Sequence, residues 1–115
     1  MTQATAIDTE LLEQYAQALG VEGLAQTLET FDKVIEGYWA ILLQSFEQKN
    51  DQALRQQAHK VKGACRSLGM LGLAEPMEAI EKNDWQWPEA ETLLQTFDSR
   101  LAPQREAVVK WLQQR

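Results

Sequence analysis

The stretch from Leu54 to Gly69 reads LRQQAHKVKGACRSLG and carries apolar residues at helical spacing. These residues recur at steps of three and four positions: Leu54, Ala58, Val61, Cys65 and Leu68. At ~100° per residue they form one continuous stripe along a helix. The pattern predicts an amphipathic helix over 52–68, capped by Asn50-Asp51 and ended by Gly69, that packs its stripe into a helical bundle.

The opposite face of this predicted helix holds an unusual pair of residues. His59, the only histidine of the chain, lies ~140° from the centre of the stripe, and Gly63 lies ~180° from it. Glycine inside a helix costs about 0.5–1 kcal/mol relative to alanine, so a glycine one turn after an exposed imidazole indicates that something large must approach it. Lys62 also falls off the stripe and is predicted to be a surface side chain, whose removal costs no more than ~0.5 kcal/mol.

Glycines and turn residues divide the rest of the chain into further helical segments. A first helix is predicted over 9–19, with Asp8 as its N-cap and Gly20 as its end. A long helix over 22–49 follows, with apolar residues at the spacing of a bundle seam: 24, 28, 31, 35, 38, 42 and 46. Another helix is predicted over 72–82, with Leu73, Met77 and Ile80 facing inward.

Three prolines constrain the C-terminal half of the chain. Pro76 is tolerable only near the first turn of its helix, and Pro88 is predicted to open the last helix at its first position. The apolar phase of that last helix continues past Pro103, which predicts one kinked helix. The predicted fold is an all-α, antiparallel four-helix bundle with an additional short N-terminal helix, in a single domain over 1–115.

Composition excludes several classes of protein. With 44% hydrophobic residues in 115, the chain is expected to be one folded domain, and its net charge of −6 argues against nucleic acid as a partner. No apolar run approaches the ~20 residues of a membrane span. Residues 1–8 have no basic or apolar part of a signal peptide, which favours the cytoplasm. Cys65, the only cysteine, is predicted to be buried on the face opposite His59, so the two cannot build a metal site.

The charge balance reverses locally around the histidine. Positions 52–74 contain no acidic residue, whereas four basic residues surround His59: Arg55, Lys60, Lys62 and Arg66. A small basic patch at the one histidine of an acidic protein would suit a phosphoryl acceptor, because the acquired group is an anion.

The arrangement H-x-x-K-G followed by a further glycine, HKVKGACRSLG from His59 to Gly69, resembles the signature of histidine-containing phosphotransfer (HPt) domains. These domains are single helical bundles of bacterial multistep phosphorelays, with the motif on the second long helix. The resemblance implies that Nε2 of His59 carries the phosphoryl group, that Lys62 offers its ammonium to the phosphoryl oxygens, and that Gly63 leaves room for the partner. Arg66 is either a second positive charge for this group or an ordinary surface arginine.

Several HPt domains also orient the imidazole with a glutamine or glutamate from the following helix. The corresponding position, 22 residues beyond His59, is Glu81. A carboxylate there would fix the tautomer with the proton on Nδ1 and leave Nε2 as the nucleophile. A helix-end surface glutamate is the alternative, and Glu78 is the second candidate for this role.

The resemblance also defines the expected partners. These are response-regulator receiver domains and a hybrid sensor histidine kinase, with Mg²⁺ supplied by the receiver domain and no cofactor of the chain's own. No ATP-binding signature is present, so the chain is expected to be a monomeric carrier and not a kinase. The initial methionine and the lack of a linker favour a free-standing protein over an excised kinase module. The alternative function is a helical adaptor that performs no chemistry.

Overall fold

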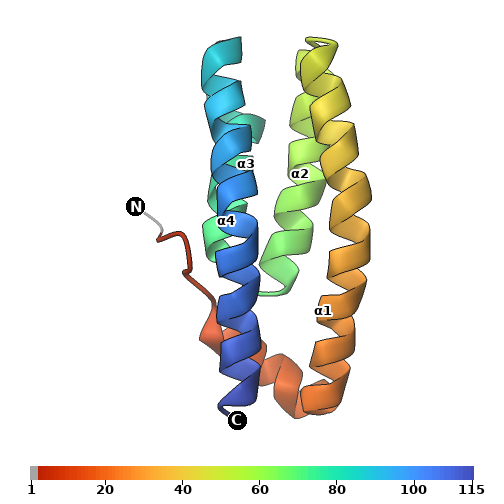
Figure 1. Ribbon diagram of the computed structural model, residues 1–115, viewed down its shortest axis with the longest axis vertical. Coiled ribbons are helices and arrows are strands. Elements are labelled where there is room, and N and C mark those ends of the chain that lie inside the picture. Colours follow the sequence, from red (N-terminus) through yellow and green to blue (C-terminus); the bar gives the residue numbers. More distant parts are fainter. Residues whose placement is uncertain (1–2) are drawn as a thin grey trace.

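The computed structural model describes residues 3–115 and consists of four long helices. They are α1 (Thr9–Glu47), α2 (Asp51–Ser67), α3 (Leu71–Lys82) and α4 (Trp87–Gln113). The helices run antiparallel in a bundle with principal extents of 43 × 27 × 19 Å (Figure 1). The predicted all-α bundle is therefore confirmed. Met1 and Thr2, which belong to the predicted domain and to the segment 1–8 without signal-peptide features, lie outside the described residues.

Gly20 separates α1 into the two segments that the sequence predicts. Its φ of 76° and ψ of 166° are non-helical, although helical hydrogen bonding continues on both sides. Because this φ lies in a region that glycine adopts without steric cost, the chain can turn sharply here. The segment before Gly20, capped by Asp8 through a 3.1 Å bond from the Leu11 N–H, crosses one end of the bundle at the bottom of Figure 1.

The predicted stripes form the core. The whole stripe of α2 is buried, and so are Leu73, Met77 and Ile80 of α3. From α1 and α4 the core receives Leu24, Leu28, Phe31, Ile35, Leu42, Leu94, Phe97 and Val108. The heptad-like spacing therefore identifies the inward faces correctly.

Two successive sets of backbone hydrogen bonds fix the junction between α2 and α3. Gly69, with φ 67°, closes α2 in a Schellman motif, in which the Gly69 N–H donates to Arg66 O and the Met70 N–H donates to Cys65 O. The N-terminal segment then crosses this junction, because the Asp8 N–H donates to Gly69 O at 2.8 Å and the Gly72 N–H donates to Ala6 O at 3.2 Å. These bonds set where α3 begins relative to α2.

Gln104, fully buried on α4, joins the same junction to the last helix. Its Nε2 donates to Ala6 O, and its Oε1 accepts from the Leu73 N–H, each at 3.0 Å. The second bond satisfies a backbone N–H that the first turn of α3 leaves without a helical partner.

The three prolines behave differently from one another. Pro76 is the sixth residue of α3, beyond the first turn to which we expected it to be confined. Its missing N–H would leave the Gly72 carbonyl unpaired, but Arg100 Nη1 of α4 donates to that carbonyl at 3.0 Å. Pro88 occupies the second helical position and not the first, because Gln86 caps α4. As predicted, one helix continues through Pro103.

We expect Gly72→Ala to destabilise the protein by about 1–3 kcal/mol, the usual cost of overpacking. An added Cβ would lie 2.6 Å from Gln104 Oε1 and closer still to the Ala4 carbonyl oxygen, and backbone cannot easily yield. Gly37→Ala is the control, because nothing lies within 4 Å of its added Cβ and alanine favours a helix interior. Urea unfolding should show opposite signs, and equal stabilities would contradict the close approach at Gly72.

Candidate functional site

The candidate site lies where α2 and α3 pack side by side. His59 of α2 has a 66% exposed side chain, and its Nδ1 lies 2.8 Å from Oε2 of Glu81, which is 19% exposed. A carboxylate only accepts hydrogen bonds, so this contact assigns the proton to Nδ1 of the neutral imidazole. Nε2 then keeps a free lone pair, and no residue in the described part of the chain bonds to it. The geometry thus brings together the two residues that the sequence pairs.

Lys62 lies elsewhere than expected. Its side chain is only 7% exposed, because α3 packs over this edge of α2, and its ammonium pairs with Glu81 Oε1 and with Glu78 Oε2 at 3.1 Å. The prediction of a solvent-exposed lysine off the packed face is therefore wrong. Helical angle measured from the apolar stripe could not show this, because a second helix covers Lys62 with acidic side chains.

Lys62, Glu78 and Glu81 shift one another's pKa values. The hydrogen bond to Glu81 is the largest cause that raises the pKa of Lys62, and hydrogen bonds from Lys62 lower the pKa of both Glu81 and Glu78. The bond from His59 lowers the pKa of Glu81 further. Because their pKa values are lower in the folded protein, Glu78 and Glu81 stabilise the fold at pH values above their ordinary pKa of 4.5. This stabilisation is lost as the pH falls through the lowered pKa values. The raised value of Lys62 stabilises the fold below 10.5, so the cluster is stabilising at neutral pH.

Gly63 opens the surface beside the imidazole. It is exposed, and nothing lies within 4 Å of the position that a Cβ would occupy. A neighbouring depression of about 530 Å³ is lined by Arg55, Gln56, His59, Lys60 and Glu81. The predicted free approach to this face of α2 therefore exists.

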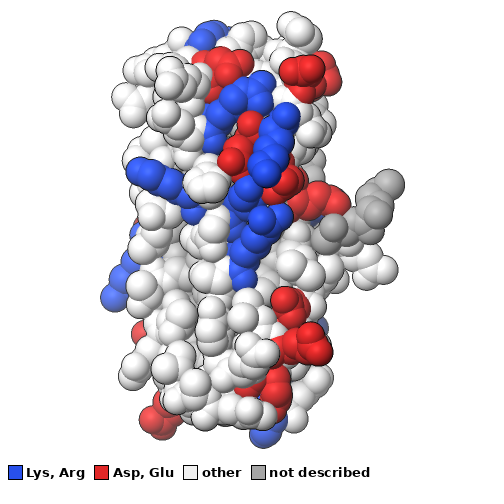
Figure 2. All heavy atoms as spheres, turned by 180° about the vertical axis from the view of Figure 1, so that it is seen from behind, with Lys and Arg blue, Asp and Glu red and all other residues white. Residues whose placement is uncertain are grey.

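The expected basic patch around His59 is neutralised in large part. Arg66, 54% exposed, pairs with Glu78 at 2.9 Å, and among the described residues it makes no contact with His59. Arg55 pairs with Asp51, while Lys60 is exposed with no ion pair among residues 3–115. Figure 2 shows this mixture of Lys and Arg with acidic side chains on the rear face of the molecule. The acidic partners come chiefly from α3, so the absence of acids in 52–74 did not reveal them.

Arg55 has a role that the sequence does not predict. We expected Arg55 only as part of the basic patch, but Arg55 Nη1 donates to three backbone carbonyls at the end of α3. The available signal was the sequence after α3, Asn83 to Gln86, which offers no glycine to close that helix.

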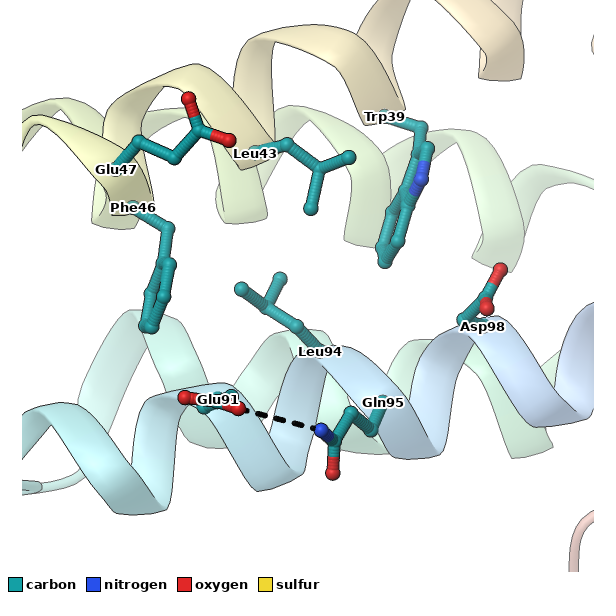
Figure 3. Close-up of a pocket in the computed structure, with 8 residues that line it drawn as sticks. All are labelled: Trp39, Leu43, Phe46, Glu47, Glu91, Leu94, Gln95 and Asp98. Atoms are coloured by element: carbon teal, nitrogen blue, oxygen red, sulfur yellow. Dashed lines mark hydrogen bonds between the residues drawn. The ribbon is translucent and has the colours of Figure 1, made fainter.

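A second cavity lies away from this chemistry. It has a volume of about 330 Å³, lies between α1 and α4, and receives the side chains of Leu43, Phe46 and Leu94 (Figure 3). Trp39, which stacks on Phe97 at 5.6 Å, forms one end. Its polar lining is carboxylate and amide, without a histidine or cysteine, so it offers no phosphoryl acceptor of the imidazole type.

Two further findings concern metal ions and membranes. Within residues 3–115, no group of three or more His, Cys, Asp or Glu side chains is arranged to hold a metal ion. Cys65 is buried, which raises the pKa of its thiol to about 12. None of the described helices is both long and apolar enough to cross a bilayer.

Comparison with known proteins identifies the family. The model of the Hpt domain family matches residues 9–111, so this chain belongs to the Hpt domain family. Hpt domains are phosphotransfer carriers of two-component phosphorelays and generally not kinases. Membership therefore implies a role in phosphotransfer within two-component signalling.

Two curated relatives and one solved structure extend this result. Aerobic respiration control sensor protein ArcB from Escherichia coli K12, and ArcB from Shigella flexneri, are each 28% identical to the chain over 78 residues. The matched region covers 68% of this chain but only 10% of each relative. The solved histidine-containing phosphotransfer domain of ArcB from E. coli has the same fold, with a TM-score of 0.84 at 22% identity, over 95% of this chain and 94% of that chain.

We expect Lys62→Ala to lower the free energy of unfolding by about 1–3 kcal/mol, because it leaves a partly buried carboxylate without its partner. Lys60→Ala is the matched control on the same helix, and its effect should stay within ~0.5 kcal/mol. Urea unfolding at neutral pH measures both. Equal small effects would show that Lys62 does not support the fold through α3.

Proposed function

We propose that His59 is the phosphoacceptor of a phosphorelay, exchanging a phosphoryl group with aspartates of response-regulator receiver domains. The observation that carries this proposal is an exposed imidazole whose Nδ1 is held by the Glu81 carboxylate at 2.8 Å. When its ring is neutral, a histidine fixed in this way presents a free Nε2 lone pair to solvent.

The reaction balances without any group from the chain acting as a base. The Nε2 lone pair attacks phosphorus of the aspartyl phosphate, the P–O bond to the aspartate breaks, and the aspartate carboxylate leaves with that electron pair. Because Nε2 carries no proton in this tautomer, no proton has to leave it. The reverse sequence donates the group to another receiver domain, and Mg²⁺ would be held by the acidic pocket of that partner.

Glu81 and Lys62 have linked roles in this proposal. Glu81 orients the ring, and its negative charge would repel an incoming phosphoryl group if it were uncompensated. Lys62 supplies the compensating charge from behind Glu81, which is how its ammonium stabilises the phosphorylated state. Arg66 acts further away through Glu78. Lys60, which makes no ion pair with the residues that the structure describes, lines the depression beside His59 and is suited to contact the partner.

The partners in this proposal are receiver domains and a hybrid sensor kinase. The name of the ArcB relatives supports a sensor protein as one source of the phosphoryl group. Gly63 would allow a receiver domain to approach over α2, since nothing lies within 4 Å of the position that its Cβ would occupy. The chain acts as a monomeric carrier in this scheme and uses no ATP itself.

Incubation with phosphorylated receiver domains should label the wild type at His59 only. We expect the modification to be labile in acid and stable in base, as an N–P bond is, and His59→Gln to abolish it. The circular dichroism of His59→Gln should match that of the wild type, because the imidazole is largely exposed. Persistent labelling of His59→Gln would refute the assignment and place the phosphoryl group on another residue, whereas a wild type that is never labelled would leave a helical adaptor as the function.

Substitutions of Gly63 should separate stability from transfer. Gly63→Ala and Gly63→Gln should melt no lower than the wild type, and alanine should add up to ~1 kcal/mol, because both remove a glycine from a helix interior with open space around it. Gly63→Gln should lose most transfer, since its longer side chain would stand in the path of the receiver domain. Normal transfer by Gly63→Gln would mean that partners approach from another side.

A further inference from the structure

The C-terminal end of α3 cannot satisfy its own carbonyl groups. α3 ends at Lys82, and its cap residue Asn83 is extended, with φ −85° and ψ 156°. In the described chain, positive φ occurs only at Gly20, Lys49 and Gly69, so no residue after α3 can close it with a left-handed cap. The last carbonyls of a helix carry partial negative charge and need donors, which here come from side chains outside α3.

Arg55 of α2 supplies most of those donors, and the Trp85 indole Nε1 adds one more by donating to Ile80 O at 2.9 Å. Its Nη1 lies 3.1 Å from Ile80 O, 3.0 Å from Glu81 O and 2.9 Å from Asn83 O. The guanidinium is itself fixed, because Nε donates to Asp51 at 2.7 Å and Cζ lies 4.5 Å from the centre of the Trp85 ring. The end of α3 is therefore tied to α2 by a side chain with little freedom to move.

Glu81 is held at both of its ends by this arrangement. Arg55 binds its backbone carbonyl, while His59 and Lys62 bind its two carboxylate oxygens. The three residues of α2 follow one another at intervals of four and three, so they share one face of that helix. Arg55, one turn before His59 on α2, holds the Glu81 backbone. The position of the Glu81 carboxylate at Nδ1 of His59 therefore depends on this bond.

We propose that Arg55 is a positioning residue for phosphotransfer: by capping α3 it holds Glu81 where its carboxylate selects the Nδ1–H tautomer of His59. This inference rests on the proposed role of His59 as phosphoacceptor. A direct contact of Arg55 with the phosphoryl group is the competing role, but the guanidinium already binds three carbonyls and Asp51.

The single histidine makes the test direct. Nitrogen-15 spectra of histidine-labelled protein report the protonation of Nδ1 and Nε2 of this one residue, and they are recorded across a pH series so that the neutral ring is observed directly. Arg55→Met keeps the stem and removes the donors, and Arg55→Lys restores a charged donor. Arg100→Met is the matched control, since Arg100 also ties α3 through a backbone carbonyl, that of Gly72, away from His59.

The wild type should show a proton on Nδ1. Arg55→Met should shift the ring towards the Nε2–H tautomer and transfer the phosphoryl group about tenfold more slowly, which is within the range that a misplacement of about 1 Å produces. Arg55→Lys should recover part of both, and Arg100→Met should lose stability with an unchanged tautomer. An unchanged tautomer in Arg55→Met, with or without slower transfer, would overturn the inference, as would an equal shift in Arg100→Met. A wild type that is not phosphorylated at His59 would instead refute the proposed function itself.

Discussion

The structure depends on the contact between α2 and α3, because this one contact both buries apolar side chains in the core and brings the residues of the site together. The apolar stripe of α2 is buried, while His59 and Gly63 on the same helix remain open to solvent. Between these two faces, α3 covers an edge on which Lys62 lies with its two acidic partners. A rotation of α3 about α2 would disturb Leu73, Met77 and Ile80 in the core and would also separate Glu81 from the imidazole. The packing of the core therefore also fixes the geometry of the site.

The charges around the histidine form ion pairs between basic residues and the glutamates of α3, and not a simple basic patch. Glu78 contacts three cations, namely Lys62 at 3.1 Å, Arg66 at 2.9 Å and Lys82 at 3.7 Å. This leaves the Glu81 carboxylate to be shared by Lys62 and His59. Salt screens partly buried ion pairs less than exposed ones. The contacts of Glu81 with Lys62 and His59 should therefore keep their geometry over a wide range of ionic strength.

Residues differ in how far their roles could be predicted from the sequence. The stripe of α2 and the break at Gly20 follow from periodicity and backbone freedom, which act within one helix. Glu81 was reached through the spacing of a known family, and the structure brings it to His59. The burial of Lys62 and the position of Pro76 were not predictable, because each depends on a side chain or helix distant in sequence. Arg55 belongs to this second kind, since its partners are 25 to 28 positions away.

Gln104 has a consequence for the order in which the protein folds. Its side chain bridges the Ala6 carbonyl and the Leu73 N–H, and the first of these bonds spans 98 positions of the chain. Closing so large a loop is entropically costly and is repaid only when the sites it joins are already in place. The α2–α3 hairpin can form from contacts close in sequence, whereas the Gln104 bridge needs both the N-terminal segment and α4 in place. Contact order therefore makes the Gln104 bridge one of the most costly contacts of the protein to close early, and we expect it to form after the α2–α3 hairpin that carries the site.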